Sequence, residues 1–182
     1  MIMTISGLPG TGTTTVSKLL QERTGMEFIS SGEIFRGIAA EFNLSLAEFG
    51  KLAETDVSYD RQIDERQKEL SKSKDNLILE GRLAGHMSMD VPPSKKILRV
   101  LLKAPLETRV RRIMNREQSS SSFKFELDQT KTREESERVR YEMYYGINIA
   151  DLSIYDLVID SSKLDPETIA DIILRAAEKV NE

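Results

Sequence analysis

The sequence lacks several residues on which whole classes of functional site depend. None of its 182 residues is cysteine, which excludes disulfides and thiolate metal ligands. His86 is the only histidine, so a zinc site built from histidines is not expected. No apolar run approaches the about 20 residues of a membrane-spanning helix, and the first residues lead into a glycine-rich loop instead of a signal peptide. We therefore expect a soluble cytoplasmic protein without a membrane partner.

The chain also lacks an excess of basic charge. Its 26 Lys and Arg residues are outnumbered by 30 Asp and Glu residues, which gives a net charge of −4. This balance disfavours a nucleic-acid-binding protein with a broad basic face, but it leaves room for a small basic pocket. The composition, 39% hydrophobic and 31% charged, together with the length, predicts one globular domain over residues 1–182.

Short apolar runs alternate with segments of helical periodicity along the chain. The predicted strands are residues 1–6, 27–30, 76–80, 97–102 and 155–160. The predicted helices are residues 14–25, 32–42, 58–73 (a polar, exposed helix), 125–145 and 165 onward, with others beginning after Ser45 and at Pro105. Such alternation predicts an α/β fold, in which helices cover both faces of a parallel sheet.

The segment from Gly7 to Thr15, GLPGTGTTT, has the glycine spacing of a phosphate-binding loop between a strand and a helix. Its glycines let backbone N–H groups turn toward phosphate oxygens at the positive end of the following helix. Thr14 occupies the position whose hydroxyl binds Mg²⁺, but Thr13 stands where lysine is usual. The alternative is a glycine-rich turn that binds no ligand.

Two further segments place an arginine just after a predicted strand. Arg36 closes SSGEIFR and Arg82 closes LEGR. Open parallel sheets bind ligands at the carboxyl ends of their strands, and the guanidinium fork matches phosphate oxygens. Each arginine alone is typical of a surface ion pair, whereas together, beside a phosphate loop, they indicate a second phosphate-bearing substrate.

A third group of arginines lies between residues 109 and 140, where glutamates interleave with them. Most of these arginines are interpreted as a solvated helix face with i,i+4 ion pairs. The serine run from Ser119 to Ser122 resembles a hinge, which favours a lid in this region. His86 is not expected to be catalytic, and Tyr141, Tyr144 and Tyr145 are expected to pack the long helix.

Together with REESERVRYEMYYGIN and DLSIYDLVID, these motifs resemble one family over nearly the whole chain. They are similar to the cytidylate kinases, in the compact form typical of archaea, within the P-loop nucleoside monophosphate kinases; the threonine at position 13 is part of that resemblance. The resemblance implies transfer of the γ-phosphoryl group of ATP to CMP or dCMP with Mg²⁺. It also implies a three-layer α/β/α fold with a five-stranded parallel sheet, an NMP-binding excursion at about 31–75 and a lid at about 116–135.

The same resemblance implies particular site residues. Those implied for ATP are Gly7, Leu8, Pro9, Gly10, Thr11, Gly12, Thr13, Thr14 and Thr15, with Thr14 also directed toward Mg²⁺. Those implied for CMP are Ser31, Arg36, Gly81, Arg82 and Glu135. Arg133, Glu135 and Arg138 match a lid segment that faces both nucleotides.

Two questions stay open at this point. Our hypothesis is that Arg116, Arg133 or Arg138 supplies the catalytic cation that Thr13 lacks, because charge on the transferred group must be neutralised. The cytosine base could be read by a carboxylate beside an arginine. Two pairs fit equally well: Glu135 with Arg133, and Asp64 with Arg66.

Other functions fit parts of the pattern. An adenylate kinase, or a kinase of a small acceptor such as shikimate, shares the phosphate loop and the first arginine segment. A non-catalytic nucleotide-binding switch is a different class; against it, the chain has no Asn-Lys-x-Asp guanine motif, and the acceptor-side arginines would have no purpose. No large apolar interface is evident, so we expect a monomer.

Overall fold

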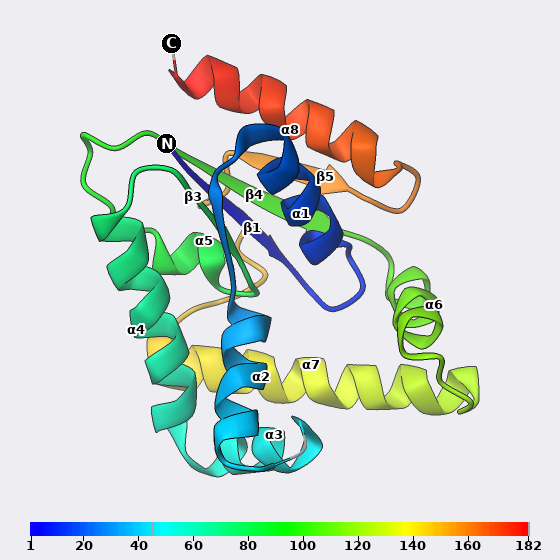
Figure 1. Ribbon diagram of the computed structural model, residues 1–182. Coiled ribbons are helices and arrows are strands. Elements are labelled where there is room, and N and C mark those ends of the chain that lie inside the picture. Colours follow the sequence, from blue (N-terminus) through cyan, green and yellow to red (C-terminus); the bar gives the residue numbers. More distant parts are fainter. Residues whose placement is uncertain (45, 182) are drawn as a thin grey trace.

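A five-stranded parallel sheet forms the centre of the molecule in a computed structural model, which describes residues 1–44 and 46–181 (Figure 1). The strand order is β2-β3-β1-β4-β5. The strands are β1 (Ile2–Gly7), β2 (Glu27–Ser30), β3 (Leu77–Glu80), β4 (Ile97–Lys103) and β5 (Leu157–Asp160). Because the chain leaves β1 toward β2 on one side and returns to β4 on the other, the sheet has a topological switch point beside β1.

Helices cover both faces of this sheet. One face carries α1 (Thr13–Thr24) and α8 (Pro166–Asn181), and the other carries α4 (Val57–Ser73) and the short α5 (Ala84–Met87). The remaining helices gather beyond the carboxyl ends of the strands (Figure 1): α2 (Ser31–Glu41), α3 (Leu46–Thr55), α6 (Leu106–Glu117) and α7 (Phe123–Tyr145). This arrangement confirms the predicted three-layer α/β/α fold.

The two faces of the sheet bury two apolar clusters. Met3 and Ile5 of β1 pack with Ile173 of α8 in the larger cluster. Leu77 and Leu79 of β3 point to the opposite face, as alternation along a strand requires, and pack in a second cluster with residues of α4 and α5. The sheet is thereby fixed from both sides, and its carboxyl edge forms a rigid platform for the site.

Helix α4 differs from its prediction as an exposed helix. Asp64, Gln67 and Ser71 are buried together with Ile63 and Leu70. The prediction was wrong because polar residues also face inward on this helix, where one side lies against β3 and lines a cavity. Among the described residues, no helix combines the length and the apolar character needed to cross a bilayer.

Smaller differences concern the ends of elements. Helix α7 already begins at Phe123, because Ser122 caps it by accepting a hydrogen bond from the Phe125 N–H at 3.2 Å. Strand β5 begins at Leu157, two residues later than predicted. The predicted cap at Ser45 lies outside the described residues.

Candidate active site

The phosphate loop connects β1 directly to α1. Helix α1 begins at Thr13, so its first backbone N–H groups and the positive end of its dipole face the space beyond the sheet. Gly10 has φ of +82°, and a Cβ at this position would lie 2.5 Å from the carbonyl oxygen of Arg109. The loop therefore needs glycine here, both for the backbone conformation and for the close approach of α6.

Thr13, at the position usually held by lysine, is buried and bound to another part of the sheet. Its Oγ1 donates a hydrogen bond to Glu80 Oε1 at 2.7 Å. Glu80 ends β3, and its other oxygen accepts a hydrogen bond from Ser30 Oγ at 2.5 Å. The Thr14 hydroxyl lies 3.4 Å from the same carboxylate. Glu80 thus joins the loop to the ends of two strands.

Glu80 is the main functional candidate that the sequence interpretation missed. The interpretation of the LEGR motif used Gly81 and Arg82 but not Glu80, although an acidic side chain at the carboxyl end of a strand beside a phosphate loop is itself a signal. Carboxylate and hydroxyl oxygens are the ligands that Mg²⁺ prefers, and this ion is usually held by one or two such groups together with substrate phosphates. Glu80 and Thr14 fit that requirement.

A large cavity of about 1540 Å³ lies at this edge of the sheet. Its size exceeds the ~300–1,000 Å³ typical of a site for one small ligand. Its lining includes every residue of the loop from Gly7 to Thr15 and residues of α2, α4, α6 and α7. The expected ATP residues and the expected acceptor residues Ser31, Arg36, Gly81 and Arg82 therefore share one space.

Gly81 contacts the start of α2 closely. A Cβ on Gly81 would lie 2.1 Å from Ser31 Oγ, so only glycine allows the two segments to approach as they do. Arg36 follows on α2; it is exposed and lines the cavity. The two predicted arginine segments thus meet beside the phosphate loop.

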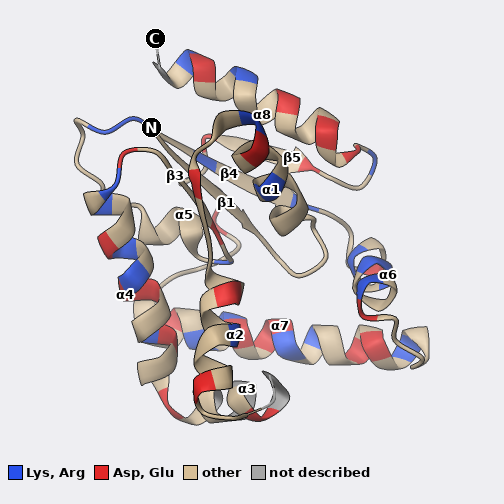
Figure 2. Cartoon of the chain, viewed as in Figure 1, with Lys and Arg blue, Asp and Glu red and all other residues tan. Residues whose placement is uncertain are grey.

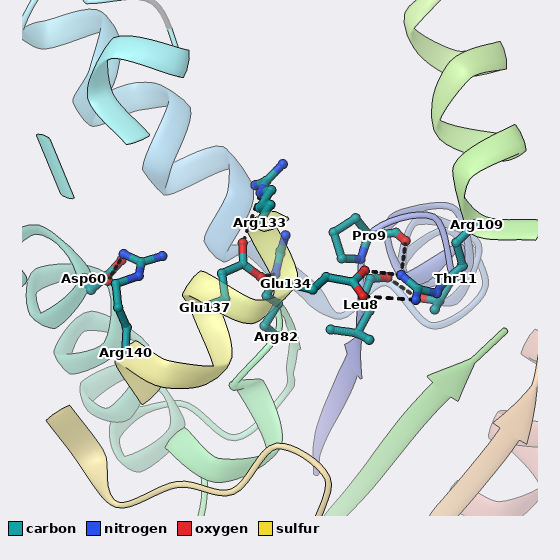
Figure 3. Close-up of polar contacts among 10 residues, drawn as sticks. All are labelled: Leu8, Pro9, Thr11, Asp60, Arg82, Arg109, Arg133, Glu134, Glu137 and Arg140. Atoms are coloured by element: carbon teal, nitrogen blue, oxygen red, sulfur yellow. Dashed lines mark hydrogen bonds and ion pairs between the residues drawn. The ribbon is translucent and has the colours of Figure 1, made fainter. Parts of the chain in front are cut away.

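Arg82 is held by a carboxylate from α7 (Figure 3). Its Nε donates to Glu137, and Glu137 also accepts from Arg133 Nε at 3.0 Å. The Glu137 side chain is 7% exposed and the Arg82 side chain 24% exposed, whereas the Arg133 side chain is 65% exposed. All three line the cavity, and sequence spacing alone gave no sign that Glu137 joins them.

A second ion pair links α7 to α4. Arg140 Nη1 donates to Asp60 Oδ2 at 2.6 Å, and both side chains are largely buried at the cavity wall (Figure 3). Basic and acidic residues alternate along α7 (Figure 2); among them Glu137 is buried, whereas Arg138 is exposed.

Arg109 and Arg112 of α6 do not belong to the predicted solvated face. Arg109 is 5% exposed, pairs with Glu134 of α7 and donates to the Pro9 carbonyl at 3.3 Å (Figure 3). Arg112 donates to the Gly10 carbonyl at 3.3 Å and to the Ser161 carbonyl at 2.7 Å. Each guanidinium thus makes one hydrogen bond to the phosphate loop, and its other hydrogen bonds go to neighbouring segments.

The three arginines expected to replace the missing lysine differ in position. Arg116 and Arg133 line the cavity. Arg138 instead pairs with Glu135 on an exposed side of α7, at 2.8 Å, and neither residue is among those that line the cavity. The expected contacts of Glu135 and Arg138 with nucleotides therefore stay predictions that this arrangement does not support.

The second carboxylate–arginine pair considered for the cytosine base was Asp64 with Arg66. Asp64 lines the cavity, but Arg66 does not. Arg66 is exposed and lies 3.4 Å from Glu69. Burial raises the pKa of the Asp64 carboxyl to about 7, with a further upward contribution from the Asp60 charge and a downward one from Lys68. His86 does not line this cavity. Its ring packs edge-on against that of Tyr155, with 6.1 Å between the ring centroids.

The raised pKa of Asp64 predicts a pH-dependent gain in stability from Asp64→Asn. The folded wild-type protein binds a proton here that the unfolded chain loses near pH 4, so its stability falls as pH rises from about 4 through 7. The free energy of unfolding of the variant, relative to wild type, should rise by about 2 kcal/mol between pH 5 and pH 8. Urea unfolding at the two pH values measures this, with exposed Asp90→Asn as the control. If the difference in unfolding free energy between Asp64→Asn and wild type is the same at pH 5 and pH 8, the pKa of Asp64 is not raised.

Comparison with known proteins gives a family that agrees with this geometry. A model of the cytidylate kinase-like family matches residues 2–163. The chain is 55% identical to the cytidylate kinase of Methanosarcina barkeri over 99% of its own length and 98% of that protein, and 53% identical to that of Methanococcoides burtonii over 98% and 97%.

Solved structures agree with the fold. A protein of unknown function from Eubacterium ventriosum has a TM-score of 0.72 at 20% identity, and shikimate kinase from Bacteroides thetaiotaomicron has a TM-score of 0.64 at 14% identity. Each match covers 98% of both chains, and at these identities they establish the fold alone. With the family model matching most of its length, the chain belongs to the cytidylate kinase-like family.

Proposed function

We propose that this protein is a kinase that transfers the γ-phosphoryl group of ATP to CMP or dCMP, giving ADP and CDP or dCDP. The observation that carries the proposal is the convergence of a phosphate loop and two strand-end arginines, Arg36 and Arg82, on one cavity. The family membership and the names of the relatives support cytidine monophosphate as the acceptor.

The ATP side of the cavity is the loop from Gly7 to Thr15. Its backbone N–H groups and the start of α1 suit the β- and γ-phosphates. Mg²⁺, when bound, neutralises charge on these phosphates. Thr14 and Glu80 are the residues that would hold it, since their oxygens lie together at the mouth of the loop.

The acceptor side needs no general base. The nucleophile is a phosphate oxygen of CMP, which is already anionic at neutral pH. It forms a bond to the γ-phosphorus while the bond to the bridging oxygen breaks, and that electron pair leaves with ADP. Arg36 and Arg82 are proposed to hold the acceptor phosphate in line, because alignment and charge neutralisation supply most of the catalysis in such reactions.

We also propose that two segments of the chain move during the reaction. We assign the NMP-binding excursion to residues 31–75, which contain α2, α3 and α4. We assign the lid to residues 116–135, which comprise the end of α6, the connection to α7 and the first half of α7. A lid in this position would bring Arg116 and Arg133 toward the transferred group as it excludes water. The protein is proposed to act as a monomer in the cytoplasm.

A coupled assay of ADP release tests this function directly. MgATP is supplied with CMP, dCMP, UMP, AMP or GMP as the acceptor. Strong turnover with CMP or dCMP is expected. Turnover with AMP alone would overturn the acceptor, and no turnover with any acceptor by folded protein would overturn the kinase activity.

The cation that replaces the missing lysine is tested by alanine substitution. At least one of Arg116→Ala and Arg133→Ala should lower kcat by ~100-fold, as loss of a donor to developing charge does. Arg138→Ala should have a smaller effect, because Arg138 lies outside the cavity. Arg175→Ala on α8 serves as the control for loss of a surface arginine. A kcat within threefold of wild type for both Arg116→Ala and Arg133→Ala would show that neither residue supplies the charge.

A further inference from the structure

Two buried polar atoms in the cavity wall lack hydrogen-bond partners among the described residues. They are Oε1 of Gln67 on α4 and Nε of Arg140 on α7. Gln67 is only 1% exposed, and both residues line the cavity. One atom is a hydrogen-bond acceptor and the other is a donor.

Such atoms are unusual in a folded protein. A buried polar group without a partner destabilises the folded protein, and nearly all such groups in native structures are satisfied. Both residues line the cavity, so a small rotation of each side chain on binding would bring these atoms against a ligand, which would then be their partner. Gln67 and Arg140 therefore indicate a ligand that offers one donor and one acceptor.

The two residues lie on one side of the acceptor space. One face of α4 lines the cavity. Its residues recur at helical spacing and are Asp60, Ile63, Asp64 and Gln67. Arg140 is anchored at one end of this face by its ion pair with Asp60. Asp60 and Gln67 are two turns apart, roughly 10 Å along the helix axis, which leaves room for one flat ring with a hydrogen bond at each end.

The position of Gln67 also relates it to the acceptor phosphate. Its Nε2 would lie 3.6 Å from a Cβ built at Gly81, next to Arg82. A nucleotide whose phosphate is held by Arg82 would therefore have its sugar and base within reach of this face of α4. The carboxyl of Asp64 lies one turn before Gln67 and offers a further acceptor on the same wall.

We propose that Gln67 and Arg140 read the cytosine base of the acceptor. Gln67 Oε1 accepts a hydrogen bond from the exocyclic amine, and Arg140 Nε donates one to the acceptor edge formed by the ring nitrogen and carbonyl. This assignment rests on the proposed function, which it deepens by naming the residues that determine specificity.

The pattern distinguishes cytosine from uracil. Cytosine carries an amine donor where uracil carries a carbonyl acceptor. Uracil would place a ring N–H against the Arg140 donor, which cannot accept a hydrogen bond, and a carbonyl against Gln67, whose amide would have to turn its Nε2 toward the base. A site built in this way rejects the wrong base more strongly than an apolar pocket does, because the unpaired buried groups add to the cost.

The test compares CMP with UMP in three variants. Gln67→Leu removes the acceptor at nearly the same size and should lower kcat/KM for CMP by about tenfold or more, while kcat/KM for UMP stays the same or rises. Gln67→Glu keeps an acceptor oxygen and should retain the preference for CMP. Arg140→Lys keeps a cation for Asp60 but lacks the Nε donor, so it too should lose preference. Gln62→Leu, the same change at an exposed position of α4, should behave as wild type.

Each outcome decides the proposal. An unchanged ratio of CMP to UMP turnover in folded, active Gln67→Leu would overturn it. Equal loss of preference in Gln67→Leu and Gln67→Glu would assign the effect to packing and would overturn it as well. If wild type does not phosphorylate CMP, the proposed function itself fails; if wild type uses CMP and UMP equally, only the assignment of base recognition fails.

Discussion

Replacing Glu80 by glutamine should lower kcat at least ~100-fold, which is the scale of losing one charged contact that acts in the transition state. Glutamine keeps the size of the side chain and an oxygen that accepts from Thr13, so the fold should survive. It removes the negative charge that lies 3.4 Å from the Thr14 hydroxyl, where we propose that Mg²⁺ is held. The loss should therefore fall on kcat and on the dependence of the rate on Mg²⁺ concentration.

The measurement is a Mg²⁺ titration of the ADP-release rate at saturating CMP. Glu27→Gln is the matched control, because Glu27 lies on the neighbouring strand β2 but is exposed and pairs with Lys74. The control should stay within threefold of wild type. A Glu80→Gln variant with wild-type kcat and an unchanged Mg²⁺ requirement would show that Glu80 serves only to hold Thr13 and Ser30.

Replacing Arg82 by alanine should reduce both activity and stability. We expect kcat/KM for CMP to fall by ~100-fold or more, since the proposed charge-assisted contact with the acceptor phosphate is lost. The same change leaves the Glu137 carboxylate, which is 7% exposed, with only the exposed Arg133 as a partner. Breaking a buried ion pair in this way costs about 3 kcal/mol of unfolding free energy.

A double variant separates the two effects. Arg82→Ala combined with Glu137→Gln removes the uncompensated charge, so urea unfolding should show that most of the lost stability returns. The activity should not return, because no residue replaces the guanidinium at the end of β3. If activity recovers together with stability, Arg82 acts only as a structural partner of Glu137 and does not bind the acceptor phosphate.

The local features of this fold were predictable from the sequence. The strand from residue 1 to 6, the glycine loop and the following helix occur in one continuous segment, so their periodicity and spacing define them without knowledge of the rest. Arg36 and Arg82 were predicted because they follow strands, and parallel strands bring their carboxyl ends to one edge.

The features that were missed depend on contacts between distant segments. Thr13 and Glu80 are 67 positions apart, and their hydrogen bond exists only because β1 and β3 are neighbours in the sheet. The face that α4 presents to the cavity is polar, so its hydrophobic pattern did not identify Gln67 as buried. In the sequence, Glu137 and Arg140 have charged neighbours like those of the exposed residues of α7. Only the packing of α7 against α4 and Arg82 distinguishes these two buried residues from the exposed ones.

The most direct test of phosphoryl transfer to cytidylate uses ATP labelled with ³²P at the γ-phosphate. The protein is incubated with this ATP, Mg²⁺ and CMP, and the nucleotides are separated by chromatography. We expect the label to appear in CDP at the rate at which ADP forms. Label that appears as inorganic phosphate while CMP stays unchanged, or that stays in ATP with folded protein and saturating CMP, would contradict phosphoryl transfer to CMP.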